Sequence, residues 1–205
     1  MKRKEEIIYA ALELASEHGS SAVTLGMIAD RVGIKKPSLY NHFSSKEEIL
    51  TAMYSFLREE AQKRMPLSSD NPSPIKEKSL EALLMDSLTV YISFLSDKDI
   101  LSFFRLLYSE RSLSPEAAKI MTEETERMIS ATKNFFYSLV VHGKMKNEDV
   151  DTAALSYAMT IHSLVDRQLD LMTAENKKLS PPEISEDMKN YIKWFSKQME
   201  VSHNE

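Results

Sequence analysis

The side chains best suited to chemistry lie in one stretch of the chain, from Thr24 to Lys46. Apart from Asp30, its polar residues are cations, hydroxyls, an amide and an imidazole, and no acid occurs between Arg31 and Lys46. Groups of this kind bind phosphate oxygens and form hydrogen bonds with base edges in the grooves of DNA. We expect phosphate contacts from Thr24, Lys35, Tyr40 and Lys46, and contacts to bases or a thymine methyl from Lys36, Pro37, Ser38, Asn41 and His42.

The apolar residues of the same stretch predict how these groups are held. They first recur at the spacing of one helical face, at Leu25, Ile28, Ala29 and Val32. Gly33 follows at once, where a tight turn between two helices favours a residue without a Cβ atom. A second, short helix at about 36–42 is expected to pack back through Ile34, Leu39 and Phe43. The pattern therefore predicts a helix-turn-helix unit with its polar face turned outward.

This stretch resembles the N-terminal signature of the tetracycline-repressor (TetR) family. The resemblance rests on Ala29 four residues before Gly33, on LYNHF at 39–43 and on SKEE at 45–48. It covers roughly the first quarter to third of the chain, and several turn, core and outward positions agree in register. It implies a transcriptional regulator, in the first place a repressor, that binds a palindromic double-stranded DNA operator as a homodimer. A small-molecule effector would release it through a shift of the fourth helix.

Two residues depart from the family pattern. Gly26 stands in the first turn of the helix before the turn, where many members place a basic or polar side chain that reaches DNA. Lys35 replaces the usual hydroxyl at the start of the second helix, which predicts a weaker N-cap. Affinity for DNA should therefore depend more heavily on Lys35, Lys36 and Lys46.

Each of these assignments has a structural alternative. A helix-turn-helix pattern can serve packing alone, and Tyr40 can be a half-buried core residue. His42 can be a capping or surface histidine. Lys46 begins a helix, where a cation opposes the helix dipole, so a nearby phosphate explains it better than helix stability does.

Composition limits the classes of protein that remain. The chain has 205 residues, 4 glycines and no cysteine, which favours an all-α fold and excludes disulfides and thiolate metal sites. No apolar run is long enough for a membrane span, and the N-terminus lacks a signal-peptide core, so a cytoplasmic protein with no membrane partner is expected. Motifs typical of enzymes are absent, and neither a cofactor nor a metal is expected.

Charge is unevenly distributed along the chain. The net charge is −5, but residues 1–65 hold 10 Lys and Arg against 9 Asp and Glu, giving +1, and the remainder is −6. Binding to DNA follows the local field, so the acidic remainder does not argue against a nucleic-acid partner.

Helical periodicity extends over the rest of the chain. Helices are expected at about 3–18, 25–32, 36–42, 46–65, 74–95, 98–110, 115–142, 149–173 and 181–200, about nine in all, with no strand. Gly19 is expected to end the first in the left-handed conformation, and Ser180 to cap the last. Residues 1–47 would form the DNA-binding domain and residues 48–205 an all-helical ligand-binding and dimerisation domain. The helix at about 46–65 would connect the two, before a linker at 66–74.

The C-terminal part carries many methionines and aromatic residues, which serve either a core or an adaptable apolar pocket. The candidate lining for an apolar or aromatic effector is Phe103, Phe104, Leu107, Tyr108, Met128, Phe136, Tyr157, Met159 and His162. A polar cluster or ion pair is favoured over ligand binding for His162, Asp166 and Arg167. The alternative is a DNA-binding regulator with a sealed core, controlled by a protein partner or without an effector pocket.

A subunit interface is predicted from the last two helices. The helix at 149–173 has two apolar stripes, one with Val150, Ala154, Tyr157, Ile161 and Val165, the other with Leu155, Met159, His162 and Leu169. A helix that is apolar on two faces is covered on two faces. Together with the family resemblance, this predicts a homodimer whose interface includes Ile161, Val165, Met188, Ile192 and Phe195.

Overall fold

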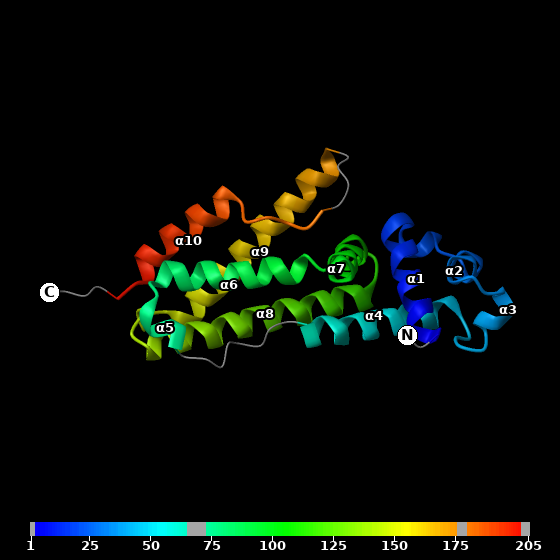
Figure 1. The fold of residues 1–205 in the computed structure, drawn as a ribbon, viewed down its shortest axis with the longest axis horizontal. Helices are drawn as coiled ribbons and strands as arrows, with labels where there is room; N and C mark the ends of the chain where they lie inside the picture. Colours follow the sequence, from blue (N-terminus) through cyan, green and yellow to red (C-terminus); the bar gives the residue numbers. More distant parts are fainter. Residues whose placement is uncertain (1–2, 65–72, 176–179, 202–205) are drawn as a thin grey trace. The chain divides into compact units, whose positions relative to one another are not determined.

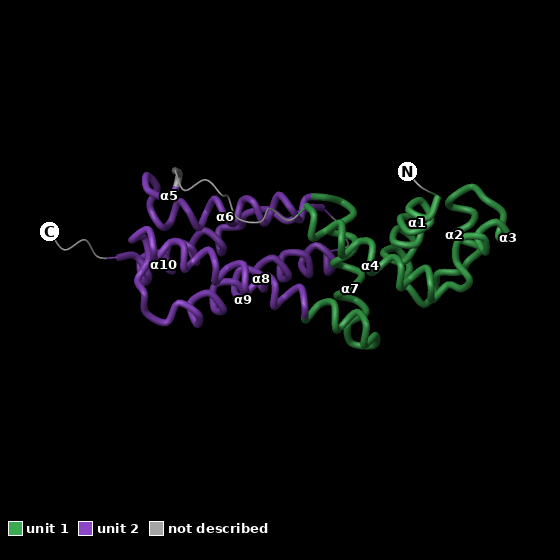
Figure 2. The backbone as a smooth tube through the Cα atoms, turned by 90° about the horizontal axis from the view of Figure 1, so that it is seen from below, with its two compact units in different colours: residues 1–65, 97–122 green, residues 66–96, 123–205 purple. Residues whose placement is uncertain are grey.

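The computed structural model describes residues 3–64, 73–175 and 180–201, and these are helical without a β-strand (Figure 1). They divide into two compact units, coloured separately in Figure 2. Unit 1 comprises Met1–Met65 and Asp97–Thr122, and unit 2 comprises Pro66–Ser96 and Glu123–Glu205. The predicted all-α class is confirmed. The units divide the chain elsewhere than the predicted boundary at 47/48, which remains a prediction based on the motif alone.

Unit 1 contains the helix-turn-helix segment and more. Its elements are α1 (Arg3–His18), the 3₁₀ turn η1 (Ser20–Ala22), α2 (Leu25–Val32), α3 (Lys36–Leu39), α4 (Lys46–Arg64), α7 (Lys98–Glu110) and the start of α8 (Pro115–Val141). Helix α1 packs against α2, α4 and α7 around one apolar core. Because Phe103, Leu107 and Ile120 belong to this core, α7 and the start of α8 are structural parts of the unit.

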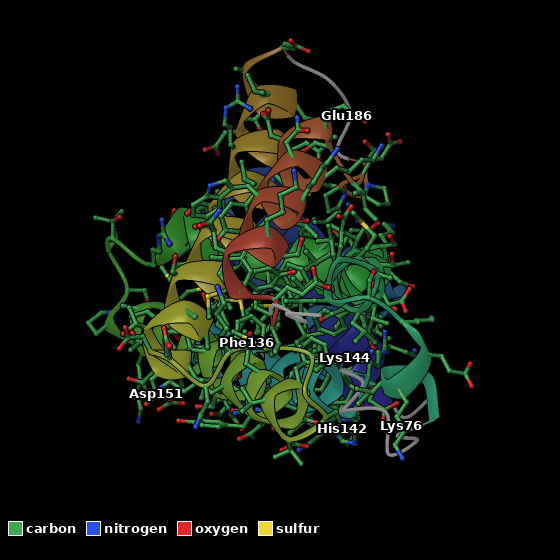
Figure 3. The ribbon with its side chains drawn as sticks, turned by 90° about the vertical axis from the view of Figure 1, so that its left-hand side faces the viewer. Lys76, Phe136, His142, Lys144, Asp151 and Glu186 are labelled. Carbon is green, nitrogen blue, oxygen red and sulfur yellow. The ribbon has the colours of Figure 1, made fainter. Side chains whose placement is uncertain are left out.

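The remaining elements form unit 2. They are α5 (Ser73–Glu77), α6 (Leu80–Leu95), the rest of α8, α9 (Val150–Ala174) and α10 (Glu186–Met199). The core is aromatic: Phe136, labelled in Figure 3, lies with its ring centroid 5.4 Å from that of Tyr157 and 5.7 Å from that of Phe195. All three are buried, and their tilted ring contacts join α8, α9 and α10.

Lysines cover helix ends in unit 2. The ammonium of Lys144 donates to the carbonyl oxygen of Lys76 in the last turn of α5 at 3.0 Å, and both residues are labelled in Figure 3. The ammonium of Lys146 donates to the carbonyl oxygen of Gln198 in α10 at 2.7 Å. Carbonyls at helix C-termini lack partners within the helix and carry partial negative charge, so these lysines stabilise the fold.

Two predicted glycine roles have different outcomes. Gly33 ends α2 in the left-handed conformation, with φ 73° and ψ 33°. The prediction for Gly19 was wrong in detail, because its ψ of 147° at φ 79° is not left-handed helical. The positive φ still explains why glycine stands there.

Several predicted helix boundaries are corrected. The helix expected at 74–95 is two, because Ser79 caps a new start by accepting from the amide of Ala82 at 3.2 Å. The last helix starts at Glu186, not near Pro181, and Ser185 rather than Ser180 caps it. A residue before proline avoids helical geometry, so Pro182 disfavours a helix that includes Pro181. Most of the predicted 66–74 linker lies outside the described residues.

The corrected start of α10 is testable by removing each serine. Ser185→Ala should lower the free energy of unfolding by about 1 kcal/mol, because the amide of Met188 loses its acceptor. Ser180→Ala is the matched control and should change stability little. Urea unfolding measures both, and an equal or larger loss for Ser180→Ala would contradict the boundary.

Candidate nucleic-acid interface

The local geometry of α2 follows from its two ends. Thr24 is the N-cap, with its hydroxyl oxygen accepting from the amide of Met27 at 3.2 Å. At the other end, the left-handed Gly33 lets the amide of Ile34 reach the carbonyl of Ala29 at 2.9 Å. These contacts turn the chain sharply into α3, as the sequence pattern predicts.

Helix α3 spans Lys36–Leu39, and turn residues continue to His42, so the regular helix is shorter than expected. Leu39 and Phe43 are 0% and 4% exposed, and they fix the inner side of this segment. The predicted DNA-contacting residues Lys35, Lys36, Pro37, Ser38, Tyr40 and Asn41 are all exposed, and His42 is half-buried. Tyr40 is 49% exposed, so it is not a core tyrosine. Lys35 makes no side-chain cap, as predicted.

The start of α4 is built by a shifted capping box. Ser45 accepts from the amide of Glu48 at 3.1 Å, and the carboxylate of Glu48 accepts from the amide of Ser44 at 2.6 Å. The hydrogen bonds from Ser44 hold the pKa of Glu48 below its usual value. In the capping-box motif the returning bond would reach Ser45 itself. The start of α4 is therefore fixed beside Phe43.

Lys46 has a partner within the chain. Its ammonium donates to the carbonyl oxygen of Ser21 at 3.0 Å and so ties the start of α4 to η1. This contact explains a cation at a helix start without a phosphate. Because an ammonium has three donors, two remain for other acceptors.

Arg31 points away from this surface. Its guanidinium lies 2.5 Å from the carboxylate of Glu13 and 3.5 Å from that of Glu17, both on α1. Its charge is therefore balanced locally, and the uncompensated positive charge of the 31–46 stretch comes from its lysines.

The nine candidate effector residues are divided between the two units. Phe103, Phe104, Leu107 and Tyr108 belong to α7 in unit 1, and Phe103 and Leu107 are completely buried in its core. In unit 2, Phe136 and Tyr157 form the aromatic core, whereas Met159 is 39% exposed. Met128 and His162 are half-buried, and the hydroxyl of Tyr91 lies 3.1 Å from Nδ1 of His162. Four of the nine, Phe103, Leu107, Phe136 and Tyr157, are thus buried in the core of their own unit.

The five residues assigned to a dimer interface are buried within the single chain, and their role in a dimer stays a prediction. Ile161, Val165, Met188, Ile192 and Phe195 are each at most 5% exposed in the single chain, so they have little surface left for a partner. They line the inner faces of α9 and α10. The second apolar stripe of α9 differs: Leu155 and Met159 are 46% and 39% exposed. This second stripe is therefore the face of α9 that its own chain leaves uncovered.

Glu110, the last residue of α7, was missed. Its carboxylate accepts from the hydroxyl of Tyr54 at 2.6 Å and from the amide of Ser20 at 2.9 Å. An acid at a helix C-terminus opposes the helix dipole, and that is the signal by which the sequence could have revealed it.

Two kinds of feature are absent from the described residues. No group of three or more His, Cys, Asp or Glu side chains gathers there as a metal site. None of the described helices is long and apolar enough to cross a membrane.

Two family models match the chain. Residues 7–53 match "Bacterial regulatory proteins, tetR family", and residues 82–197 match "AefR-like transcriptional repressor, C-terminal domain". The first covers the helix-turn-helix segment. The second covers more than half of the chain.

Individual relatives agree with this assignment. The nucleoid occlusion factor SlmA of Vibrio cholerae is 35% identical over 66 residues, 32% of this chain and 34% of SlmA. The class C tetracycline repressor protein of Escherichia coli is 37% identical over 51 residues, 25% of this chain and 23% of the repressor. The chain thus matches about a third or less of the length of these curated relatives.

The fold has a counterpart in solved structures. A protein from Saccharomonospora viridis, determined in complex with choline, is 16% identical with a TM-score of 0.65. The similarity covers 97% of this chain and 98% of that one. With matched N-terminal and C-terminal domains and this fold, the chain belongs to the TetR family of bacterial transcriptional regulators, with an AefR-like C-terminal domain.

Proposed function

We propose that this chain binds a palindromic double-stranded DNA operator as a homodimer and represses transcription until a small-molecule effector releases it. The observation that supports the proposal is that residues 35–43 divide into an exposed polar face and a buried apolar face. Their polar side chains are exposed apart from the half-buried His42, whereas Leu39 and Phe43 are buried and hold the segment in place. A rigid surface of lysines, hydroxyls and an amide, without an acid, suits the major groove. The chain then acts by binding and not by catalysis.

The surface divides into two kinds of contact. Lys36, Pro37, Ser38, Asn41 and His42 are assigned to bases, and Thr24, Lys35, Tyr40 and Lys46 to phosphates. Asn41 is the best candidate for specificity, because its amide can pair with both the N6 and N7 atoms of adenine. In a dimer the two α3 segments would enter successive major grooves, about 34–36 Å apart.

The proposed dimer interface lies on the exposed face of α9. Its exposed residues Thr152, Leu155, Ser156, Met159 and Ser163 are apolar or small, carry no charge and follow helical spacing. Interface centres are depleted of charge, which this stripe satisfies. Exposed residues on α10 are largely charged, apart from Trp194, which is 57% exposed and suits an aromatic anchor.

The effector is proposed to bind in unit 2. The hydroxyl of Tyr191 is buried there, and it has no hydrogen-bond partner among the described residues. A buried unpaired hydroxyl costs about 1–3 kcal/mol, so a ligand polar group beside it would be favoured. Its ring lies 5.9 Å from those of Tyr157, Trp194 and Phe195. An apolar or aromatic compound with one polar or cationic group fits these surroundings. Release from DNA by phosphates or sugars alone would contradict this class.

The two kinds of DNA contact should respond differently to mutation. A duplex selected from a random-sequence library by the unaltered chain serves as the probe. Lys35→Ala should weaken binding to all duplexes alike and lower the slope of log affinity against log salt by about one. Asn41→Ala should instead relax discrimination at one base position by about 1–3 kcal/mol. Fluorescence anisotropy at several salt concentrations measures both. An unchanged affinity and salt slope for Lys35→Ala would refute its assignment to a phosphate.

Replacing Gly26 by a basic residue should increase the affinity for DNA. A Cβ atom there would lie 3.7 Å from Oγ1 of Thr24, an ordinary contact, so a side chain fits. Gly26→Lys should strengthen binding to all duplexes and raise the salt slope by about one. Gly26→Ala is the control for the helix propensity gained on replacing glycine, which is worth about 1 kcal/mol of stability. If the lysine variant binds no better than the alanine variant, this position does not face the phosphates.

The interface assignment is tested by adding a charge to each exposed apolar position. Met159→Glu should give a folded monomer, because an interface centre tolerates an unpaired charge poorly. Val141→Glu is the matched control: Val141 is 82% exposed on α8 and outside the proposed face. Sedimentation measures the oligomeric state and circular dichroism the fold. A Met159→Glu dimer as stable as the control would place the interface elsewhere.

A further inference from the structure

The position of Glu110 is not explained by the stability of its own helix. It is the last residue of α7, where the partial negative charge of the helix C-terminus repels a carboxylate. No basic residue occupies the last turn of α7 to offset this. The contacts that the carboxylate makes elsewhere must therefore account for it.

Both carboxylate oxygens bind groups that are distant in sequence. One accepts from the hydroxyl of Tyr54 in α4 at 2.6 Å, and the other from the amide of Ser20 at 2.9 Å. Ser20 is the first residue of η1, so its amide has no acceptor within that turn. Gly19 before it has no side chain with which to cap. Glu110 thus caps the turn from 90 positions away.

Tyr54 holds this carboxylate in a defined place. The tyrosine is 4% exposed, and burial together with the bond to Glu110 raises its pKa far above the usual value. It therefore remains a neutral donor throughout the physiological range. A charge-assisted hydrogen bond of this kind is short and directional, as the 2.6 Å distance shows.

The capped turn leads directly into the DNA-binding surface. After Ser20–Ala22 come Val23, which is 1% exposed, and Thr24, which caps α2. The carbonyl of Ser21 accepts from Lys46 of α4. The entry to α2 is therefore held from α7 through Glu110 and from α4 through Lys46.

Helix α7 is tied to α4 at its other end as well. Asp97, the N-cap of α7, lies 2.6 Å from the guanidinium of Arg64 near the end of α4. The earlier residue of α4, Tyr54, pairs with the end of α7, and the later residue, Arg64, pairs with its start. The two helices are therefore antiparallel and joined at two points. A swing of α4 against α7 would have to break these bonds.

We propose that Glu110 is a positioning residue for DNA binding, which fixes the entry to α2 to the end of α7 and makes α4 and α7 move as one body. Helix α8 begins in unit 1, four residues after the end of α7, and continues into unit 2. A displacement of residues 97–122 thus reaches α2 through the Glu110 carboxylate. The inference rests on the proposed DNA-binding function and replaces an independent swing of α4.

The hydrogen bond from the backbone amide of Ser20 to Glu110 can be removed without changing any other contact of Glu110. Ser20→Pro lacks the N–H, and proline is well tolerated at the first residue of a helical turn. Ser20→Ala keeps the N–H and is its control. On the selected duplex, Ser20→Pro and Glu110→Ala should each weaken binding about tenfold, and the double variant no more than Glu110→Ala alone. The salt slope should stay unchanged, because no phosphate contact is lost.

Conservative and charge-matched variants complete the experiment. Glu110→Gln should recover most of the affinity, because its amide can accept from Ser20 and donate to the oxygen of Tyr54. Glu126→Ala, at an exposed acid of α8, controls for the change in net charge. Hydrogen exchange of the amides at 21–24 should be faster in Ser20→Pro than in Ser20→Ala. If Glu110→Ala does not fold, the two Ser20 variants decide by themselves.

The outcomes separate this inference from the proposed function. If the unaltered chain selects no duplex from the random-sequence library, DNA binding itself is refuted. If it binds, but Ser20→Pro matches Ser20→Ala or Glu110→Ala matches Glu126→Ala, only the role of Glu110 is overturned. Additive losses in the double variant would also overturn it, because the two changes would then act separately.

Discussion

The proposed DNA-binding surface depends on one constraint, the stability of a very short recognition helix. Isolated helices shorter than about 12–15 residues are marginal in water, and α3 spans only Lys36–Leu39. Its geometry must come from burial of Leu39 and Phe43, each worth about 1.5–3 kcal/mol. The exposed side chains between them are therefore positioned by the core of unit 1.

That core includes elements far along the chain. Phe103 and Leu107 of α7 and Met121 of α8 share it with α1 and α4, so the DNA-binding segment is not a separate three-helix body. The ionic and hydrogen-bonded contacts of Asp97 and Glu110 lie at the edges of the same packing. A regulator built in this way can transmit a change through a rigid unit instead of through a single hinged helix.

The sequence was most informative where chemistry is local. The Thr24 cap, the left-handed Gly33, the buried Leu39 and the exposed polar face of α3 all follow from neighbouring residues. Long-range choices were not predictable in this way. Nothing near Glu110 indicates that its carboxylate caps Ser20, and helical spacing alone cannot say which apolar stripe of α9 its own chain covers. The starts of α6 and α10 were misplaced because Ser73-Pro74 and Ser180-Pro181 also have the pattern of a helix start.

Whether two copies of α3 bind successive major grooves is tested directly by hydroxyl-radical footprinting of the unaltered chain on a selected duplex. Two protected patches on one face of the DNA, about one helical turn or 34–36 Å apart and related by a two-fold axis, are predicted. A single protected patch, or protection that does not fall on one face of the DNA, would contradict this arrangement.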